Sequence, residues 1–590
     1  MCCIFAAFTD NKVVIDKNIS PLRGPDDWGV SYNVVGEKYL TLFQSRLSII
    51  GLGEQGHQPY CKRDSAVLVF NGEIYNYQKL RTELEATQSL CFDTATDTEV
   101  LYEALAHWPL SDVLEKLNGI FAFVYYDVAK REIIVVRDHL GVKPVYYYHD
   151  ENKFFFASEA KIFFELNLLE PCLNRDLLGE YFANGWIYEP DTLFKNIFKL
   201  PAASYAKINL NNNDIVIDQY WNFSQNSRAV PDLNEIINDQ TISDVPVGLY
   251  FSGGVDSSIL AYDLKNHDLL NLNLCLNDSE SERVNTMEKT FSLDVKRIYT
   301  DLQNLHLYRE LIYAMDEPIA DAAMIPAFQL ARTAKNEGRV VMLSGMGGDE
   351  IDAGYTRHKI LAKMFYLKLV QPLIRFAANL LKGKIKRDLL RLSNFLSFAV
   401  PENYFSLTSY LNKKEIDSLV GKKWYEKYSV KIKFLCKGFK GKKQFFALDM
   451  KGFLASHNLI YMDKASMAAS VEVRVPLLDK NIVQYYFQQI DEPYLAGKKR
   501  LQVQLKNRLG KKYKKVRKQG FRYPVEKWVM QDINWSPVFN FMEENKIIDV
   551  TLPKKWLDDS RQHDIDGIQK LWLIYTLYLW LNEFKVNTAN

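Results

Sequence analysis

The sequence lacks the cysteine pairs and the long apolar runs that mark disulfide-stabilised or membrane-spanning proteins. Its seven cysteines are odd in number, widely scattered and without a CxxC pair, so neither a disulfide framework nor a zinc site is indicated, and a reducing compartment is expected. No stretch reaches the roughly 20 apolar residues that cross a bilayer. The longest, 571–581, predicts a buried helix. The apolar start has no basic leader, so we expect no signal peptide and a cytoplasmic location.

The chain also lacks a strong net charge. A formal charge of +2 over 590 residues gives no general attraction to nucleic acid or to membranes. Two basic runs, 422–443 and 498–518, carry no RNA-binding signature, so solvated surfaces are favoured and no nucleic-acid partner is expected. The stretch 360–400 alternates leucines with Lys and Arg at helical spacing. Core-facing helices account for it, and a peripheral membrane contact stays the alternative.

A glycine turn behind an apolar run is the most informative feature that is present. The run 245–251 ends in Gly253 and Gly254, and an acidic residue with two serines then opens an apolar-periodic stretch. This pattern predicts a buried strand, a tight turn and a helix N-terminus. Free N–H groups and the helix dipole at such a turn favour an anion, so we predict a pyrophosphate ligand. An ordinary capped turn is the alternative, and the GxxxxGK[ST] loop is excluded because no lysine follows the glycines.

A second glycine-rich turn, 344–350, follows the apolar run 340–343. Strands and helices alternate in this half of the chain, which predicts a parallel sheet whose ligands gather at the carboxyl ends of the strands. Because both turns lie at such ends, Asp256 and Asp349 are expected to converge on one Mg²⁺ beside the nucleotide. The expected ATP contacts are Leu249, Ser252, Gly253, Gly254, Asp256, Ser257, Ser258, Ser344 and Gly345.

Residues 1–210 have a different pattern, with many short strands and few helices, which predicts two stacked antiparallel sheets with helices outside. Cys2 becomes the first residue once Met1 is removed. Its α-amine, with an ordinary pKa of about 7.7–8.0, is then a suitable base for the neighbouring thiol. An inert terminal cysteine is the more ordinary interpretation of this feature alone.

Polar residues after two of these strands suit the two ends of a free amino acid. Asn71 and Gly72 can face an oxyanion, and Glu73 can hold an ammonium group. Arg46 matches a carboxylate, and Asp97 matches an α-amino group. Together with Cys2 they would attack a side-chain amide. Taken singly, a hairpin turn and solvated surface charges explain them as well.

In their order along the chain, several motifs resemble glutamine-dependent asparagine synthetases. These motifs are Cys2, 23–27, 46–49, 56–59, 71–76, 97–100, 117–119, 137–144, 252–258, 315–318, 344–350 with 354–355, 466–468 with 472–479, and 518–521. The resemblance implies an N-terminal-nucleophile glutaminase with an αββα sandwich over 1–210. It also implies an α/β parallel-sheet ATP pyrophosphatase domain with a helical C-terminal portion over 211–590, coupled to the first by ammonia passage.

The same resemblance assigns roles to residues. Cys2 is then the nucleophile and Asn71 and Gly72 the oxyanion hole, while glutamine is bound by Arg46, Glu73, Asp97 and Asn71. Lys498 is the lysine that stabilises adenylation, with Lys499 the next candidate. The implied reaction takes glutamine, ATP and a carboxylate, uses Mg²⁺, and passes through an acyl-adenylate with release of pyrophosphate.

Three departures from the family's pattern stand out, of which the first bears on the efficiency of glutamine hydrolysis and the other two bear on the acceptor. Cys3 follows the nucleophile where the family usually has Gly, Met346 replaces the Glu between two glycines, and 277–291 departs near the adenine pocket. We therefore expect the acceptor to be another carboxylate, such as a sugar uronate, with asparagine synthesis as a close competitor. The residues also leave open an enzyme that uses free ammonia, a dead regulatory or scaffold homologue, and a homodimer.

Overall fold

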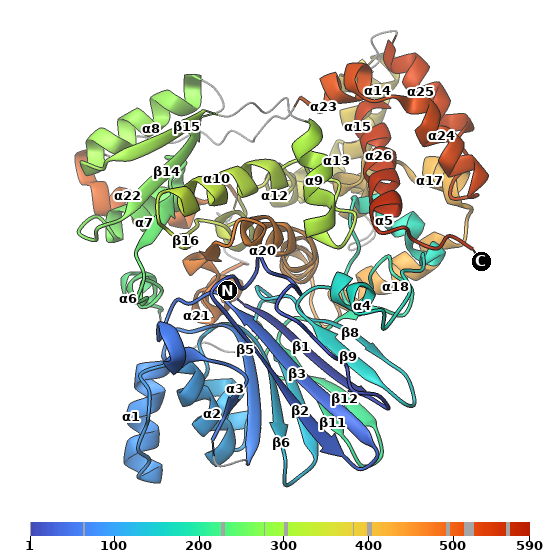
Figure 1. The fold of residues 1–590 in the computed structure, drawn as a ribbon. Helices are drawn as coiled ribbons and strands as arrows, with labels where there is room; N and C mark the ends of the chain where they lie inside the picture. Colours follow the sequence, from blue (N-terminus) through green and yellow to red (C-terminus); the bar gives the residue numbers. More distant parts are fainter. Residues whose placement is uncertain are drawn as a thin grey trace.

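A computed structural model describes residues 2–62, 65–225, 230–275, 278–299, 305–381, 383–397, 404–490, 496–512, 524–561 and 567–589. The motif at 518–521 lies outside these residues. Figure 1 shows stacked sheets in the N-terminal part, beneath a larger region of helices around a smaller sheet.

Two six-stranded antiparallel sheets form the N-terminal sandwich. The first has the order β10 (Phe198–Lys199), β8 (Tyr146–His149), β9 (Phe154–Ala157), β1 (Cys3–Thr9), β3 (Lys38–Arg46) and β2 (Asp27–Val35). The second has the order β12 (Asp214–Gln219), β11 (Ser204–Asn209), β7 (Glu132–Arg137), β6 (Gly119–Asp127), β5 (Ala66–Ile74) and β4 (Tyr60–Cys61). Alternate residues such as Ile4 and Val69 fill the core between the sheets, as the two-residue period of a strand requires.

Helices cover the outside of this sandwich, so the predicted αββα arrangement is confirmed. They are α1 (Tyr77–Gln88), α2 (Asp97–His107), α3 (Leu110–Lys116) and α4 (Lys161–Glu165), whereas α5 (Leu178–Asn184) packs against helices of the second part. α2 begins where the Thr96 hydroxyl accepts a hydrogen bond from the Glu99 N–H. β12 lies beyond the predicted boundary at 210 and pairs along its length with β11. The division of the chain stays a prediction, and we propose that the junction follows β12.

A five-stranded parallel sheet organises the second part, as predicted. Its order is β15 (Val295–Tyr299), β14 (Leu270–Cys275), β13 (Val247–Tyr250), β16 (Val341–Leu343) and β17 (Glu472–Arg474). The helices that accompany it are α6 (Leu233–Asp239), α7 (Val255–Asp263), α8 (Asp278–Phe291), α9 (Leu305–Met315), α10 (Met324–Asn336), α11 (Gly348–Ile351), α21 (Lys480–Gln488) and α22 (Lys499–Leu509). β13 and β16 are neighbours, so the turns that follow them meet at one edge.

The remaining helices of the second part lie outside this sheet and its accompanying helices. They are α12 (Thr356–Ala362), α13 (Met364–Leu369), α14 (Gln371–Leu380), α15 (Gly383–Ser397), α16 (Tyr404–Thr408), α17 (Lys413–Val420), α18 (Trp424–Leu435), α23 (Val525–Lys527), α24 (Trp535–Glu544), α25 (Thr551–Arg561) and α26 (Gly567–Glu583). The predicted buried helix at 571–581 lies within α26. Among the described residues, no helix is both long and apolar enough to cross a bilayer.

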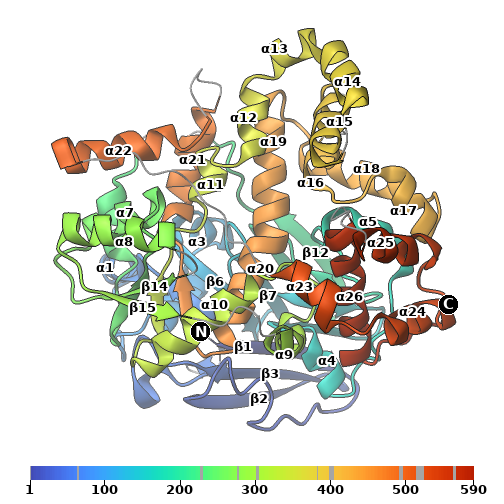
Figure 2. The same cartoon turned by 90° about the horizontal axis from the view of Figure 1, so that it is seen from above.

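One helical rod joins the two parts. It runs through α19 (Lys442–Leu448), the π-helical segment η3 (Asp449–Asn458) and α20 (Leu459–Met467), and Figure 2 shows it passing through the centre of the molecule. At its lower end Lys464 contacts Asp316, whose buried carboxylate also lies 3.3 Å from Lys161 of the sandwich. These charges are paired, which makes their burial tolerable and fixes the two parts against each other.

Candidate active sites

The predicted nucleophile lies at the start of β1, next to the end of β5. The Cys2 nitrogen donates to the Asn71 side-chain oxygen at 2.9 Å. This nitrogen becomes the α-amine once Met1 is removed, so Asn71 would hold the base while its amide nitrogen stays available to an oxyanion. Burial raises the pKa of the Cys2 thiol, against the positive charge of Arg46. The thiol is therefore protonated at rest and needs a local base.

Gly72 has a conformation that suits glycine. Its φ is +140°, and a Cβ there would lie 2.0 Å from the Ile120 carbonyl oxygen on the paired strand β6. Any larger residue would push β5 and β6 apart. The sharp local geometry thus keeps Asn71 and the Gly72 backbone beside Cys2.

Arg46 ends β3 and is buried, with 4% of its surface exposed. Its guanidinium donates to the carbonyls of Ile50, at 2.8 Å, and Gly51, at 2.7 Å. A Cβ at Gly56 would lie 1.8 Å from the guanidinium, so only glycine lets that loop close over it. Arg46 is positioned by the loop that follows its own strand.

Glu73 and Asp97 form a buried acidic pair. Asp97, at the first turn of α2, accepts the Ile74 N–H at 3.1 Å. Burial raises the pKa of Asp97 to about 6, against this bond. Burial, with repulsion from Asp97 added, raises the pKa of Glu73 as well, and Arg474 opposes that shift from 3.7 Å. A ligand ammonium group placed here would relieve the repulsion between the two carboxylates.

Cys3 does not share the environment of the nucleophile. It is fully buried on β1, where successive side chains point to opposite faces, and it packs in the main apolar core. Burial, with the nearby Glu159 carboxylate, raises the pKa of its thiol to about 12. Cys3 is therefore a neutral packing residue at physiological pH.

The two glycine turns of the second part touch each other. A Cβ at Gly345 would lie 2.8 Å from the Asp256 Cβ, and one at Gly348 would lie 2.4 Å from an Asp256 carboxylate oxygen. In the first turn, the Ser252 and Ser257 hydroxyls lie 3.1 Å apart. This edge therefore presents hydroxyls, backbone N–H groups and the start of α7, as an anion site requires.

The other residues that were predicted to contact ATP are less accessible. Leu249 is buried within β13, and the buried Ser258 hydroxyl has no partner among the described residues. Ser344 accepts the Met346 N–H at 3.3 Å, within the second turn. Arg283, which was not predicted, donates from α8 to the Ser252 carbonyl at 3.0 Å. It holds α8 against the first turn, and the roles of all these residues in binding stay predictions.

Asp256 and Asp349 converge, and they converge on Lys498. The Lys498 ammonium contacts Asp256 and lies 2.9 Å from Asp349. Burial works against its charge, but the two carboxylates raise the pKa of Lys498. Gly354 permits this approach, because a Cβ there would lie 2.6 Å from the Lys498 side chain and 2.0 Å from Asp349.

The donor set at this edge suits Mg²⁺. Two carboxylates beside a phosphate-type turn are the hard oxygen ligands that the ion combines with nucleotide oxygens. Among the described residues, no group of three or more His, Cys, Asp or Glu forms a metal cage. An ion here would therefore depend on Asp256, Asp349 and the nucleotide.

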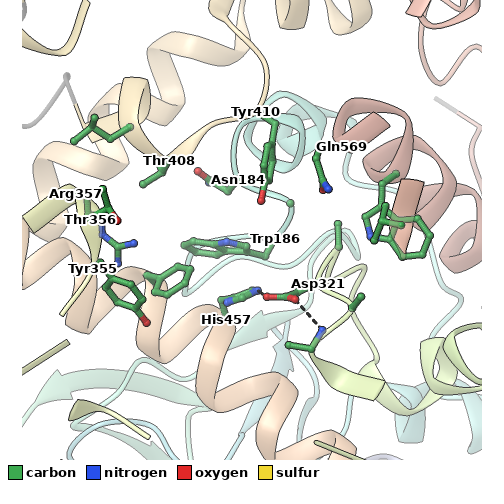
Figure 3. A pocket seen from close by; sticks show the side chains of 18 of the residues that line it. Asn184, Trp186, Asp321, Tyr355, Thr356, Arg357, Thr408, Tyr410, His457 and Gln569 are labelled. Atoms are coloured by element: carbon green, nitrogen blue, oxygen red, sulfur yellow. Dashed lines mark hydrogen bonds and ion pairs between the residues drawn. The ribbon is translucent and has the colours of Figure 1, made fainter. Parts of the chain in front are cut away.

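A large cavity lies beside the second turn, between the helical rod and the outer helices. Its volume is about 900 Å³, at the upper end of the ordinary range for ligand pockets. Figure 3 shows Trp186 near its centre, with Tyr410 and Asn184 on one side and His457 and Asp321 on the other. Further lining residues are Tyr188, Tyr355, Thr356, Arg357, Tyr404, Thr408, Phe453, Gln569 and Trp572.

A chain of polar contacts joins the cavity to the acidic turn. Asp321 lies 3.3 Å from His457, which lies 2.8 Å from Asn458. Asn458 donates to Glu350 at 2.9 Å, and the hydroxyl of Tyr355 donates to the same carboxylate. Because Glu350 follows Asp349 directly, these contacts link the wall of the cavity to the turn that carries Asp349.

Comparison with known proteins supports this arrangement. A glutamine amidotransferase domain model matches residues 1–221, and an asparagine synthase model matches residues 231–582. The chain belongs to the asparagine synthase family. It is 31% identical to a putative glutamine-hydrolysing asparagine synthetase 2 of Methanocaldococcus jannaschii, over 72% of this chain and 90% of the relative. It is 27% identical to glutamine-hydrolysing asparagine synthetase 1 of Bacillus subtilis, over 95% and 91% of the two chains.

Among solved structures, the B. subtilis glutamine phosphoribosylpyrophosphate amidotransferase matches 50% of this family member and 81% of that chain, with 15% identity and a TM-score of 0.28. The family membership makes this chain an asparagine synthetase-like, glutamine-hydrolysing enzyme of an ATP-using family.

Sequence reasoning missed two features of this family member. Arg474 reaches Glu73 from the other half of the chain, although its motif was one of those that indicated the family. The cavity was not predicted either, because its wall combines segments near 186, 321, 355, 408, 457 and 569. The unusual density of aromatic residues in these segments was the one signal available.

Proposed function

We propose that this enzyme transfers the amide nitrogen of glutamine to a carboxylate other than that of aspartate, after activating the carboxylate with ATP as an acyl-adenylate. The class of acceptor that we favour is a sugar uronate, free or carried on a larger molecule. The aromatic cavity beside the adenylation edge carries this proposal, because its volume exceeds what a single amino acid fills.

In the glutaminase half, Cys2 would attack the glutamine amide carbon and pass its proton to its own α-amine. Asn71 and the Gly72 N–H would stabilise the oxyanion, and Glu73 with Asp97 would hold the substrate's ammonium group. The ammonia released would then reach the second site through the contact region around Arg474 and the rod.

In the synthetase half, Ser252 and Ser257 with the neighbouring N–H groups would bind the phosphates. Asp256 and Asp349 would hold Mg²⁺, which neutralises charge on the leaving pyrophosphate. Nucleotide binding would free Lys498 from its carboxylate partners to face the reacting phosphate.

Two observations favour an acceptor with hydroxyl groups. Aromatic rings such as Trp186 and Tyr410 offer flat apolar surfaces of the kind that sugar rings pack against. The cavity is also lined by Thr356, Thr408 and Gln569, whose side chains can donate hydrogen bonds to hydroxyl groups and accept hydrogen bonds from them.

Met346 supports the same conclusion from the chemistry of the second turn. The asparagine synthetases that the sequence resembles carry a carboxylate at this position, and a thioether cannot replace its hydrogen bonds or charge. Asparagine synthesis is the second candidate, because the relatives named above are asparagine synthetases.

The test is pyrophosphate release with glutamine and ATP against aspartate, uronic acids and nucleotide-linked uronates. We expect a uronate to stimulate release. Thr408→Trp, which would fill part of the cavity, should raise the KM for that acceptor about tenfold and leave glutamine hydrolysis unchanged. Stimulation by aspartate alone, unaffected by Thr408→Trp, would overturn the proposal.

A further inference from the structure

Helices α13 and α14 turn large apolar side chains outward. Within each helix the exposed apolar residues are three or four residues apart, which places them on one face of that helix; the two sets together are called the stripe. The stripe and its exposed fractions are Tyr366 72%, Leu369 72%, Leu373 68%, Phe376 65% and Leu380 70%. Of the 22 large apolar residues that are exposed in the described parts of the chain, eight lie within 366–385. This is a concentrated patch rather than ordinary scatter.

The inner face of α14 contains Ile374, which packs half-buried against the core, and two alanines. Ala378 is fully buried and Ala377 is half-buried, on a helix that packs against α15. The expectation that the helices of 360–400 face the core is therefore wrong for the outer face of α13 and α14. The helical periodicity is present as expected, but the sequence alone could not show which face of each helix meets the protein.

The charge around this patch has one sign. The stretch 359–391 contains nine Lys or Arg residues and a single acidic residue, Asp388, whereas the whole chain carries only +2. Lys363, Lys368 and Arg375 are exposed on these helices. An apolar stripe with basic neighbours is the pattern of a helix that lies in the interface of an anionic bilayer.

The position of these helices connects them with the cavity. The chain leaves the cavity wall at Arg357, passes through α12 to α15, and returns to the wall at Tyr404. Figure 2 shows α13, α14 and α15 projecting from one edge of the molecule. A surface that held these helices would therefore lie close to the entrance of the cavity.

We propose that the outer face of α13 and α14 docks this enzyme on an anionic lipid surface. The apolar stripe would enter the headgroup region, and the basic side chains would face the phosphates. A second copy of the chain fits less well, because it would bring two equally basic segments together. The proposal stands on exposure and charge, and it does not depend on the identity of the acceptor.

The experiment is co-sedimentation of the full chain with vesicles. We expect binding to vesicles that contain phosphatidylglycerol, weakening with added salt, and little binding to pure phosphatidylcholine. Leu373→Glu with Phe376→Glu should reduce binding about tenfold or more. Both side chains are exposed in the protein, and their replacement puts negative charge on the stripe that would enter the headgroup region. The matched control is Val34→Glu with Val216→Glu, which changes two exposed apolar residues of the sandwich and should bind as the wild type does.

Glutamine hydrolysis and the thermal unfolding midpoint of each variant show whether it is folded. Equal vesicle binding by the Leu373→Glu, Phe376→Glu variant and the wild type would overturn the proposal. The proposal would also be overturned if the wild type did not bind vesicles but formed a dimer that this double substitution dissociates. The partner of the stripe would then be a second copy of the chain.

Discussion

Two pairs of acidic residues, one in each half of the enzyme, have opposite electrostatic surroundings. Glu73 and Asp97 are buried close together, and burial raises the pKa of both carboxyls even though Arg474 lies 3.7 Å from Glu73. Asp256 and Asp349 share the ammonium group of Lys498. The first pair is thus prepared for a cation supplied by the ligand. The second pair already holds a cation, which a nucleotide with its metal ion would have to displace.

This difference indicates which of the two sites keeps the substrate of the family and which site can accept a different substrate. The glutaminase site is closed, and its predicted residues lie together around Cys2 and β5. The synthetase site keeps its phosphate edge and carries Met346 in its second turn, and polar contacts through Glu350 link that turn to the wall of a wide cavity. The nitrogen donor is therefore expected to be the one shared by the family, and the acceptor is the variable part.

Removal of the nucleophile should have the largest effect on activity, and it should separate the two sites. Cys2→Ala should abolish glutamine-dependent amide formation, because Cys2 carries the thiol beside the nitrogen that Asn71 holds, and the neighbouring Cys3 is buried in the core. Amide formation with added ammonium salt should persist within about twofold, because the second site is untouched. Glutamine hydrolysis by this variant at the wild-type rate would show that the first site has been misplaced.

Removal of the lysine between Asp256 and Asp349 should have the second largest effect. Lys498→Ala should reduce pyrophosphate release by about 10²–10³-fold, because the charge that faces the reacting phosphate is lost. Lys499→Ala is the matched control, since the neighbouring side chain is exposed and should change release by less than about twofold. Equal losses in the two variants, measured at saturating ATP, would remove the special role of Lys498.

The first pair should show a pH dependence that the second does not. Asp97 is ionised only above its pKa of about 6, so the KM for glutamine should rise as the pH falls through 6. Asp97→Asn should raise that KM by about tenfold or more above pH 7, and the difference from the wild type should shrink below pH 6, where the wild-type carboxyl is already neutral. A wild-type KM that is flat between pH 5 and 8 would contradict this assignment.

The same substitution should stabilise the fold. A raised carboxyl pKa means that the native state binds the proton more tightly than the unfolded chain, so Asp97 lowers the stability as the pH rises from about 4, and the loss is complete above its native pKa of about 6. The shift corresponds to about 3 kcal/mol at most. Asp97→Asn should therefore unfold at a higher temperature than the wild type at pH 8, and the difference should shrink toward pH 4.

The smallest effect is expected at Cys3. Its thiol pKa of about 12 leaves it neutral, and its side chain lies in the core. Cys3→Ala should change the kcat/KM for glutamine by less than about twofold, in contrast to Cys2→Ala. A large loss, with an unchanged unfolding midpoint, would mean that the second thiol takes part in the reaction.

The sequence predicted those parts of the sites that depend on local pattern. The turns after β13 and β16 were predictable because glycine pairs after apolar runs have few structural solutions, and neighbouring parallel strands bring such turns together. The convergence of Asp256 and Asp349 followed from that rule. The lysine between them was predicted only through the family resemblance.

What could not be predicted depends on packing between distant segments. Arg474 meets Glu73 because β17 lies at the edge of its sheet that faces the sandwich, and no local pattern encodes that contact. The outward face of α14 was misjudged for the same reason, since periodicity gives a stripe but not its direction. The cavity likewise needs the rod, α5 and α26 in place together.

The most direct measurement follows nitrogen from glutamine labelled with ¹⁵N in its side-chain amide. The enzyme would receive ATP together with equal concentrations of aspartate and a uronic acid, free or nucleotide-linked. Our account predicts ¹⁵N in a uronamide, with pyrophosphate released in proportion. Labelled asparagine as the product, with no labelled uronamide, would contradict it.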